Sequence, residues 1–195
     1  MSFSNLISSA IEQATSHSSG GGSGSGSYDP EFSSAQHHAQ AHESSSGDSS
    51  LFSSALGFLS DRKSQYSEQP DIDEEHLVQS HQQLYNGGGG YGEEQQHDSK
   101  SLGAGAAMQA LKMFTSGGGG GSSGGDKNEF IGMAMAQASK LWEEKSGSGN
   151  VSGDKQSAVN SAAEMAFKMY MKSQGSGSSG TGGPAALMSL ASKFL

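Results

Sequence analysis

The chain contains no cysteine. Disulfides, thiolate metal sites and a cysteine nucleophile are therefore excluded, and the composition fits a reducing compartment. No apolar run reaches the roughly 18 residues of a membrane helix, and no basic, apolar leader opens the sequence, so we expect a cytoplasmic protein. Lys and Arg form no dense cluster in a chain of net charge −9. Counterion release would add little to binding, so we expect no nucleic-acid partner.

Alternating apolar strands are also missing, so neither a Rossmann sheet nor a hydrolase sheet can be built. The nearest approach to a catalytic motif is the glycine-rich stretch 117–130. A P-loop needs Gly-Lys-Ser/Thr after a buried strand. Here no strand precedes the glycines, Asp126 stands before Lys127, and Asn128 replaces the hydroxyl residue. We expect a tether followed by a helix, with no nucleotide, no other cofactor and no enzymatic activity.

Charge divides the chain near residue 97. Residues 1–97 carry 13 acidic and 2 basic residues, a net charge of −11, whereas residues 98–195 carry 7 and 9, a net charge of +2. Residues 18–50 are dominated by Ser, Gly, His and Gln and cannot bury enough apolar surface to offset the entropy lost on ordering. This predicts a disordered acidic arm over residues 1–47. Its apolar residues over 3–14 recur at helical spacing and allow one short amphipathic helix.

Two helices are predicted over residues 48–86. Asp48 is a suitable N-cap for the first. Asp71 and Glu74 have capping-box spacing for the second, whose apolar face includes His81. A glycine-rich acidic linker, residues 87–97, follows. The apolar face of the first helix consists of Leu51, Phe52, Ala55, Leu56 and Leu59.

Beyond residue 97 the sequence repeats with a period of 28 residues. Asp98, Asp126 and Asp154 mark the three copies and are the expected helix N-caps. Each copy reads as a helix followed by a glycine and serine tether, and a shorter helix starts at Pro184. We therefore predict an all-α fold: a small helical bundle over residues 98–195, built from three helix-plus-tether copies and flanked by the helices of residues 48–86.

Small and flexible side chains dominate these helices. Gly103, Gly105 and Gly132 allow close helix approach despite their low helix propensity. Most methionines are expected to fill the core, and exposed ones would make adaptable docking surfaces. The candidates for packing or docking are Met133, Met135, Trp142, Met169 and Tyr170.

One histidine pattern has metal-ligand spacing. His38 and His42 stand at i, i+4, with His37 beside them, and would clasp zinc, nickel or copper if that stretch were helical. No glutamate follows His38, so the metalloprotease signature is absent. In a disordered arm the pair makes no defined site. We therefore assign no metal and keep these histidines as the candidates.

The strings LFSSALGFLSDRK, DIDEEHLVQSHQQLY and SLGAGAAMQALKMF, with the later alanine and methionine helices, resemble an uncharacterised group of filamentous-fungal proteins called beta-flanking proteins. The likeness covers about residues 48–195 and implies a small helical domain of unknown function. From the residues we expect a non-enzymatic protein that acts by contact with an unknown protein partner or by self-association. One alternative is a hydrophilic stress protectant that gains helix on drying or on membranes. Another is lipid attachment through the helix over residues 3–14.

Overall fold

The fold is all-α, as predicted, in a computed structural model that describes residues 30–43, 48–68, 71–86, 96–116, 126–175 and Ser192. The elements are η1 (Pro30–Phe32), α2 (Ser33–His42), α3 (Ser49–Glu68), α4 (Glu74–His81), the π-helical turn η2 (Gln82–Asn86), β1 (His97–Asp98), α5 (Ser99–Ser116), α6 (Lys127–Gly147), β2 (Val151–Ser152) and α7 (Lys155–Gly175). The predicted helix over residues 3–14 and nearly all of the one after Pro184 lie outside the described residues.

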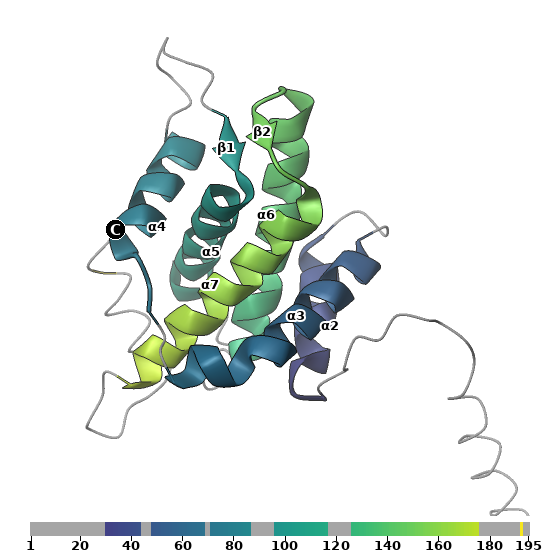
Figure 1. The fold of residues 1–195 in the computed structure, drawn as a ribbon, viewed down its shortest axis with the longest axis vertical. Coiled ribbons are helices and arrows are strands. Elements are labelled where there is room, and N and C mark those ends of the chain that lie inside the picture. The colour runs from purple at the N-terminus through teal and green to yellow at the C-terminus, as the bar shows by residue number, and fades with distance from the viewer. Residues whose placement is uncertain are drawn as a thin grey trace, which may run out of the picture.

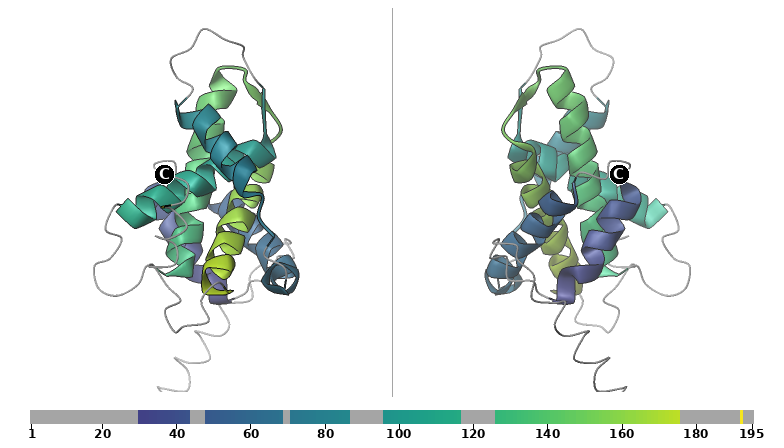
Figure 2. Two further views of the ribbon diagram at one scale, coloured as in Figure 1. Left: turned by 90° about the vertical axis from the view of Figure 1, so that its left-hand side faces the viewer. Right: turned by 90° about the vertical axis from the view of Figure 1, so that its right-hand side faces the viewer.

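Three helices form the centre of the bundle, and each is covered by one helix from earlier in the chain. α5, α6 and α7 each contact the other two. α2 packs on α6, α3 on α7, and α4 on α5 (Figure 1). α2 therefore lies on the side that faces the viewer in the right-hand view of Figure 2, and α4 on the side that faces the viewer in the left-hand view.

The three central helices begin directly after the aspartates of the 28-residue spacing. The Asp98 carboxylate accepts a hydrogen bond from the Ser101 backbone N–H at 2.7 Å. Asp154 accepts one from the Ser157 N–H at 2.8 Å and one from the Ser157 hydroxyl at 2.9 Å. Asp126 occupies the N-cap position of α6, but its side chain accepts no capping hydrogen bond. Two of the three aspartates therefore cap with their side chains.

A two-residue pairing holds the starts of α5 and α7 together. β1 and β2 are parallel, with His97 opposite Val151 and Asp98 opposite Ser152. The His97 N–H also donates to the Asn150 carbonyl at 2.9 Å. β1 runs directly into α5, and only Gly153 and Asp154 separate β2 from α7, so α5 and α7 start side by side at the end of the bundle where α6 finishes (Figure 1).

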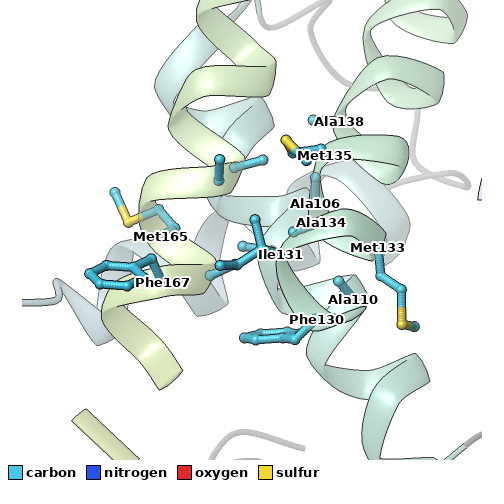
Figure 3. Packing of buried hydrophobic residues seen from close by; sticks show 14 of the residues in the cluster. Ala106, Ala110, Phe130, Ile131, Met133, Ala134, Met135, Ala138, Met165 and Phe167 are labelled. Atoms are coloured by element: carbon cyan, nitrogen blue, oxygen red, sulfur yellow. The ribbon is translucent and has the colours of Figure 1, made fainter. Parts of the chain in front are cut away.

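The core is built from small side chains interleaved with a few large ones. Figure 3 shows Ile131 of α6 pointing towards α7, where Phe167 lies, while Met133 points to the other side of α6. Close helix approach at the three predicted glycines is confirmed. A Cβ on Gly103 would collide with Ser161 of α7, one on Gly105 with Leu84 of η2, and one on Gly132 with the backbone of α2.

The expectation of a disordered arm is wrong for residues 30–43. Phe32, Ala35 and Ala39 are buried against the bundle, and α2 follows α6 along its length. The Asn128 side-chain amide donates to the Glu31 carbonyl at 2.6 Å and to the Ser34 hydroxyl at 2.7 Å. A segment with few apolar residues is ordered here because its alanines approach the backbone of α6 at Gly132.

The helix predicted to start with Asp71 begins two residues later. Asp73 is the N-cap of α4, and its carboxylate accepts the His76 N–H at 2.9 Å. Ile72 is buried in the core, and the residues before Asp73 lie outside the helix and pack through Ile72. The capping-box interpretation of Asp71 with Glu74 is therefore wrong.

Candidate functional site

The packing or docking candidates fall into two groups. Met133, Met135 and Met169 are buried, with at most 5% of their surface exposed, so they are packing residues. Trp142 and Tyr170 are partly exposed. The methionines in the described part of the chain form no exposed strip, since only Met113 and Met171 among them are partly exposed. Docking on this part of the protein therefore depends on aromatic side chains.

Trp142 belongs to a group of partly exposed side chains that we call the rim: Tyr85, Trp142 and Val151. All three pack on a small second core made of Leu84, Leu102, Leu141 and Ala158. The Trp142 indole N–H donates to the Gly153 carbonyl at 3.1 Å. The indole is therefore held in one orientation with part of its surface open to solvent, at the end of the bundle where β1 and β2 pair (Figure 1).

The π-helical turn η2 positions the second aromatic residue of the rim. Because it continues directly from α4, the Tyr85 ring stacks on the His81 ring, with centroids 5.0 Å apart. His81 is buried, and its Nε2 lies 2.9 Å from the Gln109 Oε1. Burial, with a smaller effect of Glu144, raises the pKa of the Tyr85 hydroxyl. Tyr85 is therefore neutral over the physiological range and presents an uncharged ring.

The acidic and histidine residues of α4 do not converge on a common point. The Glu74 carboxylate pairs with the Lys172 ammonium of α7 at 2.5 Å. Glu75 is exposed, and the His81 ring faces Gln109. These contacts connect α4 to α5 and α7, and the groups of this helix make no acid–base pair with one another.

A polar cluster that sequence analysis missed surrounds Lys155, the first residue of α7. Its ammonium lies 2.5 Å from the Asp48 carboxylate and 2.6 Å from that of Glu143. The buried Ser139 hydroxyl donates to the same Asp48 oxygen at 2.5 Å. Burial alone would lower the pKa of Lys155, but the hydrogen bonds to Asp48 and Glu143 outweigh it and raise the pKa. Lys155 is therefore held as an ammonium between the two carboxylates, which disfavours the neutral amine that a base or nucleophile needs.

Three carboxylates of this cluster are close enough together to consider a metal. Oxygens of Glu43, Asp48 and Glu143 lie within 4.8 Å of one another. The Lys155 ammonium already binds two of them and supplies the positive charge there. Burial, opposed by a hydrogen bond with Ser139 and helped by the Asp48 charge, raises the pKa of Glu43. The cluster thus joins the start of α3 to α6 and α7 by an internal ion pair.

The lysine of the glycine-rich stretch has a similar partner. The Lys127 ammonium forms an ion pair with Glu31 of η1 and lies 4.9 Å from the centre of the Phe32 ring. Lys127 and Lys155 are one period apart in the 28-residue spacing, and each binds an acidic residue of the N-terminal segment. The 28-residue periodicity indicated that these two lysines occupy equivalent positions, but it did not identify their acidic partners. Residues 117–125 lie outside the described residues.

The histidines singled out in the sequence lie on α2. His37 is exposed, whereas His38 and His42 are partly exposed. The i, i+4 spacing of His38 and His42 brings them together only in a helix. The structure meets this condition, because α2 spans Ser33–His42.

Comparison with known proteins finds one family. Residues 31–119 match the family described as Domain of unknown function (DUF7721). No curated protein and no solved structure matches the chain significantly. The match is consistent with an uncharacterised domain family. No helix of the described residues is long and apolar enough to cross a bilayer.

The matched segment is only part of the folded unit. It spans α2, α3, α4 and α5, but α2 packs on α6 and α3 on α7, and both of these partners lie beyond residue 119. Within the segment, only α4 packs extensively on α5. The core that buries Phe32 and Phe52 is therefore completed by residues 126–175.

Proposed function

We propose that the protein acts in the cytoplasm, without catalysis, by binding another protein through the rim. One observation carries this proposal: the Trp142 indole is fixed by its bond to Gly153, packed on a core and still partly exposed. Trp and Tyr dominate the energetics of protein interfaces, because a rigid aromatic side chain loses little entropy on binding and buries a large area. Tyr85, immobilised against His81, adds a second such group.

The polar features of the described residues support binding over catalysis. Lys155 is neutralised by two carboxylates, Ser139 is fully buried, and His81 faces Gln109. A nucleophile and its base must both reach a substrate, and these groups are engaged in holding helices together. The lack of cysteine supports a reducing compartment.

We also propose that the protein belongs to the fungal beta-flanking group. We further propose that α5, α6 and α7 derive from one 28-residue unit. The first is supported by the strings that resemble that group. The second is supported by the helix starts at Ser99, Lys127 and Lys155, which keep the spacing.

Site-specific photo-crosslinking tests the rim. The full chain would carry a benzophenone amino acid at position 142 or, as the control, at position 58, where Phe58 is also partly exposed but lies on α3. We expect a discrete crosslinked product from position 142 in a lysate of the producing cells, and none from position 58. Excess wild-type protein should reduce the yield of the crosslinked product from position 142, whereas the same excess of the Trp142→Ala protein should not. Equal suppression by that variant, or no product at 142, would refute the proposal.

A thermal melt separates this proposal from the protectant alternative. A protectant that is unfolded in dilute buffer would show a coil spectrum with no transition. The packed core predicts a helical spectrum with a cooperative melt. A product with the mass of two chains in the crosslinking experiment would identify self-association.

A further inference from the structure

Helix α2 places two imidazoles one turn apart. It spans Ser33–His42, so His38 and His42 are at i, i+4 and share a face. Residues at this spacing have Cβ atoms about 5–6 Å apart, which allows both rings to reach one ion. His37 is one residue away, which turns it by about 100° around the helix axis, and its own i+4 position is Ala41.

Both rings have nitrogens available for an ion. His38 and His42 are partly exposed. Among the residues that the structure describes, no hydrogen bond or ion pair engages either imidazole. A neutral imidazole presents one nitrogen lone pair and is the side chain that late first-row divalent ions prefer, whereas Ca²⁺ and Mg²⁺ prefer oxygen.

The local charge favours a cation at this end of α2. His42 is in the last turn of α2, where the helix carries partial negative charge from its free carbonyl groups. The next residue, Glu43, belongs to the cluster with Asp48 and Glu143, in which the Lys155 ammonium pairs with two of the three carboxylates. A cation bound to the histidines would be attracted by the excess negative charge nearby.

We propose that His38 and His42 form a two-histidine site for Ni²⁺, Cu²⁺ or Zn²⁺, with water in the remaining positions. Because the ion needs both rings on one helical face, it binds α2 only when the helix is formed. α2 is helical while packed on α6 at Gly132. Binding therefore stabilises the folded state over the unfolded state by mass action. Ala39 follows His38, so no general base of the metalloprotease type accompanies the ion.

The test measures urea unfolding of the full chain, without a polyhistidine tag, with and without Ni²⁺. At a free Ni²⁺ concentration 100 times the dissociation constant, the folding equilibrium constant should rise about 100-fold. His38→Gln and His42→Gln should abolish the shift, whereas His37→Gln, the matched control, should keep it. The proposal is overturned if wild type shows no shift, if His42→Gln keeps it, or if His37→Gln loses it equally.

A second measurement does not depend on stability. Electron paramagnetic resonance of the Cu²⁺-loaded protein should show two coordinating imidazole nitrogens in wild type and in His37→Gln. One nitrogen should be lost in either His38→Gln or His42→Gln. An unchanged nitrogen count in both of these variants would place the ion elsewhere and refute the site.

Discussion

The packing of α2 on α6 makes a quantitative prediction for Gly132→Ala. The new Cβ would lie 2.6 Å from the Ala35 carbonyl oxygen, 2.6 Å from the His38 Cβ and 2.8 Å from the Ala39 nitrogen. Ordinary contacts begin at 3.4 Å. Two of these atoms are backbone, so no side-chain rotation relieves the clash and α2 must shift. Overpacking of this kind destabilises the folded state by about 1–3 kcal/mol, whereas replacing glycine by alanine inside a helix stabilises it by roughly 1 kcal/mol.

Gly147→Ala, also in α6, isolates the packing effect. Nothing lies within 4 Å of a Cβ at position 147, the last residue of α6, so this variant lacks the clash and gains less helix propensity than an interior position would. We expect Gly132→Ala to be less stable than Gly147→Ala by about 1–3 kcal/mol in urea unfolding followed by circular dichroism. Hydrogen exchange should show reduced protection of the α2 amides in Gly132→Ala alone. If the two variants are equally stable, α2 does not approach the α6 backbone at Gly132 closely, and this approach is not what orders the polar segment of residues 33–42.

Further changes test the polar contacts and the extent of the folding unit. Lys155→Met leaves two carboxylates together and should lower the free energy of unfolding by about 3 kcal/mol in urea titration. Asp154→Ala should lower the melting temperature by the equivalent of about 1 kcal/mol, and Asp126→Ala by less, because the Asp154 side chain accepts capping hydrogen bonds whereas that of Asp126 accepts none; equal effects would contradict this. Burial and the nearby Lys145 lower the pKa of His97 in the folded protein. The contribution of neutral His97 to the free energy of unfolding is therefore present above about pH 6.5 and is lost as the pH falls through the lowered pKa. His97→Gln should therefore flatten the decline in stability between pH 7 and 5, and an unchanged profile would count against it. A fragment of residues 31–119 should show no cooperative melt, whereas residues 30–175 should; a cooperative melt of the shorter fragment would show that it folds without α6 and α7.

The central helices could be predicted from the sequence because their signals are local. The aspartates at 98, 126 and 154 stand directly before helices α5, α6 and α7. The face of α3 was predicted too: Phe52, Ala55, Leu56 and Leu59 are buried there, although Leu51 is partly exposed. In these segments apolar periodicity and a start signal agree.

The missed features depend on partners far away in the chain. α2 is polar, and its two buried alanines can pack closely only against Gly132. That glycine lies more than 90 residues later in the chain. The Lys155 cluster likewise joins groups from α3, α6 and α7. The Trp142 rim was predicted only in part, because the bond to Gly153 and the position of Tyr85 depend on a turn and a π-helical segment. One sequence gives no direct information on such pairings.

The order in which the helices pair also has a consequence for biosynthesis. α2 and α3 leave the ribosome before α6 and α7, on which they pack; the bond between Asn128 and the Glu31 carbonyl spans 97 positions. At about 5–20 residues per second, the early helices wait several seconds before a surface exists for them to pack on. The low apolar content of α2 is suited to that interval, since a more hydrophobic α2 would pack more strongly once folded but would expose an aggregation-prone surface on every nascent chain.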